Sequence, residues 1–190
     1  VVDVPVTVKH RIGIDKTGRY ELVRDFVGTV SEAGCEVFIV HARNAWLKGL
    51  SPKENREIPP LRYGLVHQLK HDFPHLTIAV NGGITTDTQI ADQLQLVDGV
   101  MVGREAYHNP WVMASWDETF FGAAPNGLTR EAVEAPMCDY MVRQAAAWGT
   151  SWSSVARHML GLRNGLPGAC NWRQVWSDHR PQAPNPHGGL

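Results

Sequence analysis

Four short runs of mainly hydrophobic residues recur in the first part of the chain, and each ends in polar or glycine residues. They span residues 6–11, 38–43, 78–83 and 99–104. Continuous apolar runs of this length are typical of strands in parallel sheets, because helices cover both faces of such sheets. We therefore expect four parallel strands.

Helical patterns separate these runs. Apolar residues recur at three- and four-residue spacing before Gly34 and again between Pro60 and Pro74, and a capping-box sequence opens a third helix. The residues concerned are Leu22, Val23, Phe26, Val27 and Val30, then Leu61, Leu65 and Leu69, then Thr86 and Gln89. The order βαβαβαβ with right-handed crossovers predicts an α/β fold with one parallel sheet.

The pattern changes after Arg104. Asn109 and Pro110 can start a short helix, and residues 122–127 form a loop rich in Gly, Ala and Pro, where we place a domain boundary. From Thr129 onward only helical periodicity is visible. One face carries Met137, Tyr140, Met141, Ala145 and Trp148, and another carries Val155, Met159 and Leu162. We expect a sheet domain over 1–122, a small all-helical domain over 128–178 and a disordered tail over 179–190.

Composition limits the class of protein only broadly. A chain of 190 residues with 43% hydrophobic content can bury a core, and a formal charge of -1 gives no overall basic field for nucleic acid. The three cysteines lack metal-ligand spacing, which favours a reducing, cytoplasmic compartment and predicts no metal. No apolar run approaches the roughly 20 residues of a membrane span. The opening on Val1 rather than methionine suggests the middle of a longer protein.

Two strand ends carry the residues of a phosphate site. Asn81, Gly82 and Gly83 follow the third apolar run, and Gly103 and Arg104 follow the fourth. Ligands of parallel β/α proteins bind at the carboxyl ends of strands, where glycines expose backbone N–H groups and an arginine offers a forked donor. The alternative is that the glycines only close turns and Arg104 pairs with a surface carboxylate.

The other two strand ends carry Lys9 with Arg11, and His41 with Arg43. An ammonium group at a strand end can stabilise negative charge on a reduced flavin ring, and a histidine can hydrogen-bond to the same ring. Either residue alone would more simply be a solvated lysine or a core histidine. Their matched positions on adjacent strands favour the ligand site.

Longer stretches of the sequence resemble the A-type tRNA dihydrouridine synthases. The matching segments are Val8–Asp15, His41–Leu47, Gly49–Arg56, Pro59–Leu61, Asn81–Ile84 and Gly99–Tyr107, within a likeness that runs from about Pro5 to Trp172. The resemblance implies the C-terminal half of a TIM-type (β/α)8 barrel followed by a helical domain that binds tRNA. It also implies FMN as cofactor, NADPH as reductant, and reduction of uridine to 5,6-dihydrouridine in the tRNA D-loop.

The same resemblance assigns residues to each ligand. FMN would contact Lys9, His41, Asn81, Gly82, Gly83, Gly103 and Arg104. The loop over residues 44–59 is longer than usual for a βα connection, and long ordered loops are commonly functional. Within it Lys53 and Arg56 are implied as tRNA contacts, together with Arg173 from an arginine- and tryptophan-rich stretch after Tyr140. Cys170 stands where similar proteins have an arginine.

The family's catalytic acid has no counterpart in this sequence. Similar proteins use a cysteine in a Gly-Cys-Pro loop, whereas Cys35, Cys138 and Cys170 lie in other contexts and are interpreted as structural or incidental. No catalytic residue is therefore assigned, and we expect the missing N-terminal half of the barrel to supply it. The alternatives are a non-catalytic RNA-binding fragment and another phosphate-binding flavoenzyme barrel, such as a dihydroorotate-type enzyme.

Overall fold

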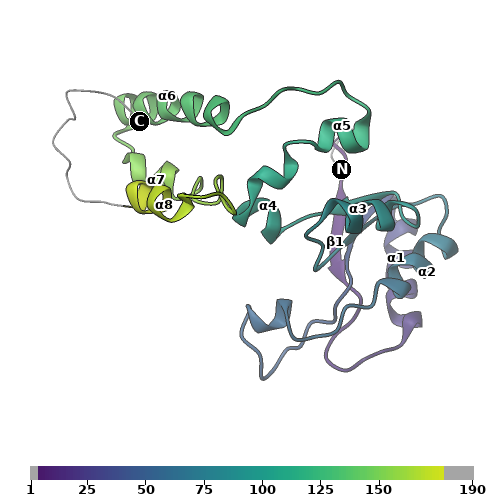
Figure 1. Cartoon of the computed structure of the whole chain (residues 1–190). Coiled ribbons are helices and arrows are strands. Elements are labelled where there is room, and N and C mark those ends of the chain that lie inside the picture. The colour runs from purple at the N-terminus through teal and green to yellow at the C-terminus, as the bar shows by residue number, and fades with distance from the viewer. Residues whose placement is uncertain (1–3, 178–190) are drawn as a thin grey trace, which may run out of the picture. The chain divides into compact units, whose positions relative to one another are not determined.

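A computed structural model describes residues 4–177 of the chain. Strands and helices alternate through its first part, which Figure 1 draws in purple to teal. The elements of the first compact unit, which ends at Gly103, are β1 (Thr7–Arg11), α1 (Tyr20–Glu32), β2 (Val37–His41), the 3-10 turn η1 (Glu54–Arg56), α2 (Tyr63–Asp72), β3 (Thr77–Asn81), α3 (Asp87–Leu94) and β4 (Gly99–Met101).

The four strands form one parallel sheet in the order β1-β2-β3-β4, so the predicted α/β arrangement with four parallel strands and helices between them is confirmed. The strands end earlier than the apolar runs suggested: β2 stops at His41 and β3 at Asn81. For β3 the reason is that residues 82–83 carry left-handed backbone angles, which a strand cannot contain. His41 and Asn81 thus end their strands, the predicted glycines and Arg104 follow strand ends, and Lys9 lies within β1.

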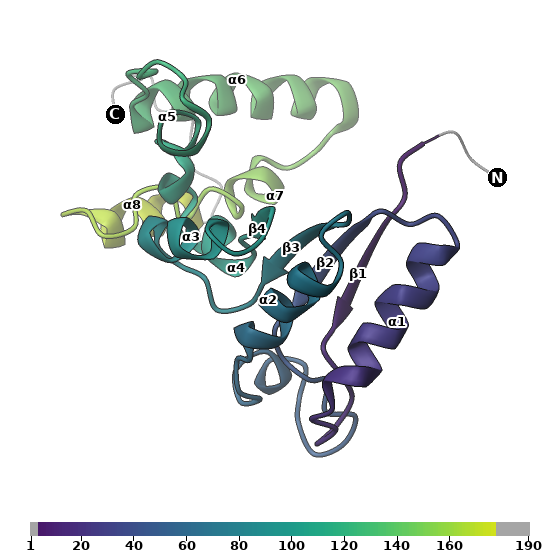
Figure 2. The same ribbon diagram turned by 90° about the vertical axis from the view of Figure 1, so that its right-hand side faces the viewer.

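The core of this unit lies between the sheet and its helices. Phe38 and Val40 on β2 and Ile78 and Val80 on β3 are fully buried, because alternate strand residues point to the same face. Figure 2 shows α1 and α2 beside the sheet. Their buried residues are Val23 and Val27 on α1, and Val66 and Leu69 on α2. Burial of each such side chain contributes roughly 1.5–3 kcal/mol.

The helix α1 buries less than its apolar pattern suggested. Val23 and Val27 are buried, but Leu22 is 50% and Phe26 43% exposed. These two side chains line an apolar hollow of about 610 Å³ together with Ile12 and Ile14. The sheet thus covers only part of the apolar face that the sequence predicted for α1, and Leu22 and Phe26 lie outside the covered part.

The capping box predicted for the third helix is present. Thr86 accepts a hydrogen bond from the backbone N–H of Gln89, and the Gln89 side chain accepts one from the backbone N–H of Thr86. The two bonds satisfy donors that a helix N-terminus would otherwise leave without partners. The helix α3 therefore begins where the sequence indicated, shortly after the turn at Gly82 and Gly83.

The second compact unit starts at Arg104, and its described residues form helices and turns. These elements are α4 (Arg104–His108), the 3-10 helix η2 (Pro110–Met113), α5 (Trp116–Phe121), α6 (Arg130–Trp148), α7 (Trp152–Ala156) and α8 (Ala169–Ser177). The domains expected over residues 1–122 and 128–178, a barrel half and a tRNA-binding domain, stay predictions. The predicted tail lies outside the described residues.

The core of the second unit is formed by Met141, Ala156, Met159 and Leu162, with Trp172 and Trp176 packed against it. Only part of the predicted face of α6 contributes. Met141 is buried, whereas Tyr140 is 39% and Trp148 79% exposed. Trp148 is the last residue of α6, seven residues after Met141. None of the described helices is both long and apolar enough to cross a membrane.

Candidate functional site

The register of the sheet places three of the predicted ligand residues, Lys9, His41 and Asn81, on one face. Arg11, His41 and Asn81 are neighbours across β1, β2 and β3, and Lys9 lies two residues before Arg11 on the same side of β1. This face is opposite to the one that buries Phe38 and Ile78, and Lys9 is exposed on it. Lys9, His41 and Asn81 therefore share the face that leads to the carboxyl edge of the sheet.

The turn after β3 requires its two glycines. Gly82 has φ +118° and Gly83 has φ +70°, which are angles that other residues rarely adopt. A Cβ atom on Gly83 would lie 2.6 Å from Cδ1 of Leu61, and one on Gly82 would lie 3.3 Å from Nε2 of His41. The two glycines thus leave no room for a side chain of their own, because Leu61 and His41 pack against them. A turn without side chains is one in which an anion can approach the backbone N–H groups.

Tyr63 holds this turn from the start of α2, and sequence reasoning missed it. Its hydroxyl donates a hydrogen bond to the carbonyl oxygen of Gly82 and lies 3.4 Å from the position of a Cβ on Gly83. Burial raises the pKa of Tyr63, against a smaller opposing effect of the Arg43 charge. The hydroxyl therefore stays protonated and keeps donating. No local pattern could have indicated a partner 19 residues away.

Asn81 has a structural role as well as the predicted one. Its side-chain Nδ2 donates to the carbonyl oxygen of Met101 at 2.7 Å and so ties β3 to β4. Asn81 is 8% exposed, so this bond satisfies a buried donor. What the side chain can still offer a ligand is its Oδ1 oxygen, which is a hydrogen-bond acceptor.

The fourth strand end is the link between the two compact units. Gly103 is the last residue of the first unit, and a Cβ there would meet nothing within 4 Å. Arg104 is the first residue of α4 in the second unit, and it already makes an interaction within the protein. The structure therefore shows open space at Gly103 and places Arg104 directly after it in the chain.

The long loop after β2 is ordered by specific hydrogen bonds. Its first part is joined to the loop after β1, where Ala45 and Ile14 form a bridge and Asn44 donates to the carbonyl oxygens of Asp15 and Thr17. Lys53 precedes η1 and Arg56 ends it, and both residues are exposed. The two predicted tRNA contacts of this loop thus lie on one short turn at the surface.

The cysteine nearest in sequence to the sheet lies at its other end. Cys35 precedes β2, and its thiol contacts the carbonyl oxygens of Val6 and Val37 at 3.7 and 3.5 Å. A five-residue strand spans about 16 Å, so Cys35 is remote from the carboxyl edge where His41 and Asn81 lie. Cys138 is on α6 and Cys170 on α8. No group of three metal-ligating side chains occurs within residues 4–177.

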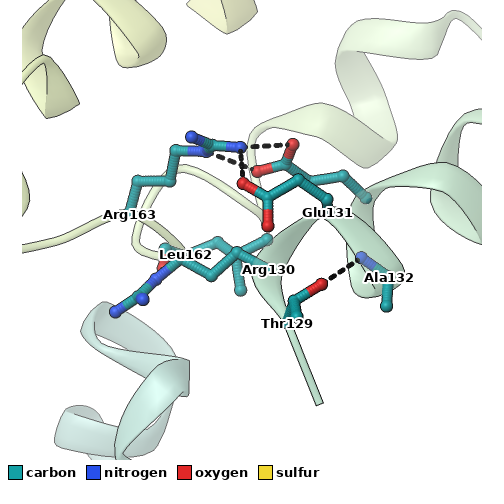
Figure 3. Close-up of polar contacts among 7 residues, drawn as sticks. Thr129, Arg130, Glu131, Ala132, Leu162 and Arg163 are labelled. Carbon is teal, nitrogen blue, oxygen red and sulfur yellow. Dashed lines mark hydrogen bonds and ion pairs between the residues drawn. The ribbon is translucent and has the colours of Figure 1, made fainter. Parts of the chain in front are cut away.

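The arginine-rich stretch is less uniform than its sequence suggested. Arg163 donates to both carboxylate oxygens of Glu134, at 2.7 and 3.0 Å, and to Glu131 at 2.8 Å (Figure 3). These acids lie on α6, N-terminal to the arginine-rich stretch, so the composition of the stretch gives no sign of them. Arg173 is half-buried on α8 and donates to the side-chain oxygen of Asn164 at 3.1 Å.

With this geometry in place, comparison with known proteins defines the class of the chain. Residues 1–185 match the Dihydrouridine synthase (Dus) family. The chain therefore belongs to the dihydrouridine synthase family.

Its curated relatives carry a more specific name. It is 53% identical over 184 residues to a tRNA-dihydrouridine(20/20a) synthase of Escherichia coli (strain K12), an alignment that covers 96% of this chain and 53% of the relative. It is also 53% identical over 185 residues to the protein of that name from Pseudomonas syringae pv. tomato, covering 97% of this chain and 55% of the relative. The chain thus spans about half the length of these relatives.

Proposed function

We propose that this protein reduces uridine to 5,6-dihydrouridine in the D-loop of tRNA, with FMN as cofactor and NADPH as reductant. The observation that carries the proposal is the family match over residues 1–185 together with 53% identity to tRNA-dihydrouridine(20/20a) synthases. Because tRNA is processed in the cytoplasm, a cytoplasmic location belongs to the same proposal.

The described residues fit a flavin phosphate. Gly82 and Gly83 are packed against Leu61 and His41, and their positive φ angles turn the backbone so that N–H groups can face an anion. Gly103 and Arg104 would add a third glycine and a guanidinium to the same ligand. Bound FMN would supply the hydride.

Three side chains on the sheet would face the ring of the cofactor. Lys9 would place a positive charge beside it, His41 would donate or accept a hydrogen bond, and Asn81 would accept one through Oδ1. Their support is the shared face of the sheet and the register that joins His41 to Asn81. No residue of this chain is proposed as the proton donor, since Cys35 lies at the opposite end of the strands.

For tRNA we propose Lys53 and Arg56 on the loop after β2 and Arg173 on α8. Lys53 and Arg56 are exposed, and Arg173 is partly accessible. Arginine and lysine contacts to phosphate supply most of the salt-dependent part of nucleic-acid binding. Arg163 is left out of this set because Glu134 and Glu131 already neutralise it.

The proposal is tested by nucleoside analysis of tRNA. A tRNA transcript without modifications is incubated with the purified protein, FMN and NADPH, and dihydrouridine is measured by mass spectrometry. We expect product from protein of the relatives' length and none from residues 1–190 alone, because none of the three cysteines is proposed as the acid. Absence of dihydrouridine in both reactions would refute the function. Product from residues 1–190 alone would refute the proposal that the acid lies elsewhere.

A further inference from the structure

The loop between β2 and α2 has little regular structure of its own, so its shape must be held by side chains. Apart from η1, residues 44–59 form turns and extended backbone. A loop of this length would lose much of its order without fixed anchors, because each residue ordered costs about 1–2 kcal/mol of backbone entropy.

Arg11, the last residue of β1, reaches two separate points of this loop. Its Nη1 donates to the carbonyl oxygen of Asn44 at 2.7 Å and to that of Asn55 at 2.9 Å. One guanidinium nitrogen thus joins the beginning of the loop to η1, eleven residues later in the chain. Because Arg11 pairs with His41 in the sheet, the anchor itself stands on rigid structure.

Asn55 closes the same connection from inside the loop. Its Oδ1 accepts a hydrogen bond from the backbone N–H of Trp46 at 2.8 Å, and its Nδ2 donates to the Trp46 carbonyl oxygen. Arg43 fastens the far end, since its Nη1 donates to the carbonyl oxygens of Glu57 and Pro59. Lys53 and Arg56, the proposed tRNA contacts, lie on the segment between these anchors.

The partners of Arg11 are backbone carbonyls rather than carboxylates, so its positive charge is not neutralised by them. Burial lowers the pKa of Arg11, and the nearby charges of Arg43 and Arg56 lower it further. Arg43 and Arg56 therefore lie close enough to Arg11 for their charges to repel it. Two roles for Arg11 follow from these contacts. It holds residues 44–59 in one conformation through its hydrogen bonds, or it contributes a positive charge that attracts RNA.

We infer that Arg11 is a positioning residue, which clamps residues 44–59 in the shape that presents Lys53 and Arg56 to tRNA. This inference rests on the proposed function for its RNA part, and on the hydrogen bonds alone for its structural part. It predicts that the length and geometry of the arginine side chain matter more than its charge, since a lysine ammonium lies one bond closer to the backbone than Nη1 and would fall short of the Asn44 and Asn55 carbonyl oxygens.

The test uses Arg11→Lys, which keeps the charge and loses the guanidinium, in the full 190-residue chain. Arg62→Lys is the matched control, because Arg62 also donates to a loop carbonyl, that of Gly18, which lies outside residues 44–59. Amide hydrogen exchange is measured at Trp46 and Asn55, whose N–H groups bond to Asn55 Oδ1 and to the Ser51 carbonyl oxygen. Affinity for a tRNA transcript is measured at several salt concentrations.

We expect Arg11→Lys to speed exchange at both amides about tenfold or more, and to weaken tRNA binding by about tenfold with a shallower salt dependence. Exchange in β2 and β3 should not change, and Arg62→Lys should behave like the wild type in both measurements. Asn55→Ala is a second variant on the loop that leaves Arg11 and the sheet intact. It should reproduce both effects.

Each result decides the inference. Unchanged exchange in folded Arg11→Lys would show that Arg11 is not a clamp, whatever the result for Asn55→Ala, because that variant itself removes the acceptor of the Trp46 N–H. Faster exchange with unchanged tRNA affinity would show that the loop shape does not serve RNA. Wild-type chain that fails to bind tRNA would refute the RNA part together with the proposed tRNA contacts, while the exchange data would still decide whether Arg11 holds the loop.

Discussion

At the scale of single residues, the turn at Gly82 and Gly83 makes the strictest demand on the sequence. Gly83→Ala would place a Cβ 2.6 Å from Leu61 at a left-handed backbone position. We expect it to lower the free energy of unfolding by about 2 kcal/mol, because the left-handed conformation alone costs about 1–2 kcal/mol. It should also weaken FMN binding. Denaturant titration and flavin fluorescence measure the two effects.

Gly64→Ala is the matched control for this prediction. Gly64 lies in α2, and a Cβ there would meet nothing within 4 Å. Alanine in a helix is favoured over glycine by about 1 kcal/mol, so this variant should be as stable as the wild type or more stable. If Gly83→Ala were no less stable than Gly64→Ala, the turn would not be constrained as described.

Lys9 is a prediction about charge rather than space. It is exposed on β1, two residues before the strand ends. Lys9→Met should leave FMN affinity almost unchanged but slow reduction of bound FMN by NADPH about tenfold or more, since a fixed positive charge stabilises the charge that develops on reduction. Stopped-flow absorbance follows the reduction, with Lys16→Met as the exposed control. An equal effect of both variants would exclude a specific role for Lys9.

At the scale of elements, Asp98 joins a helix to two strands. Asp98 directly precedes β4. Its carboxylate accepts a hydrogen bond from Lys70 on α2 at 2.9 Å and another from the backbone N–H of Ile78 on β3 at 2.8 Å. Burial pushes the pKa of Asp98 upward, but the bonds from Ile78 and Lys70 outweigh burial and hold the pKa below its usual value of 3.8. The ionised carboxylate therefore stabilises the fold.

This pKa fixes the direction of a pH dependence. Because the pKa of Asp98 is lower in the folded than in the unfolded chain, its contribution is present above pH 3.8 and is lost as the pH falls through the folded value. Asp98→Asn should cost about 1 kcal/mol at neutral pH, reduced by solvent screening, and nothing in strong acid. Urea titrations across pH measure this, with the exposed Asp92→Asn as control. A pH-independent difference would contradict the assignment.

At the scale of the whole molecule, the described residues form two compact units, which meet between Gly103 and Arg104 in the chain. The tryptophans separate them spectroscopically, since Trp46 belongs to the first unit and the other six to the second. Helices occur in both units, so circular dichroism follows both, whereas tryptophan fluorescence follows mainly the second. Fluorescence and circular dichroism can therefore show whether the units unfold separately.

Arg163→Met should destabilise the second unit specifically. It would leave Glu134, which is 8% exposed, buried without its partner, and breaking a buried pair in this way costs about 3 kcal/mol. We expect the fluorescence transition to move to lower denaturant while part of the circular dichroism change stays in place. Arg143→Met, exposed on the same helix as Glu134, should alter neither. Coincident shifts of both probes would show that the units unfold as one.

The sequence by itself determined the order of strands and helices, the capping box at Thr86 and the positions of candidate ligand residues at the strand ends. These features are local: they depend on periodicity, on glycine and on neighbours three or four residues apart. For the same reason the apolar runs alone were enough to place His41 and Asn81 at matching ends of two strands.

Only the tertiary structure decided which polar side chains are already engaged. Arg163 meets Glu134 across 29 residues, Arg11 meets Asn55 across 44, and Tyr63 supports Gly82 from α2. Such partners are brought together by packing of the sheet and helices, and no periodicity in the chain encodes them. That is why the sequence makes Arg163 look like a free cation, and why the anchors of residues 44–59 are visible only in the folded protein.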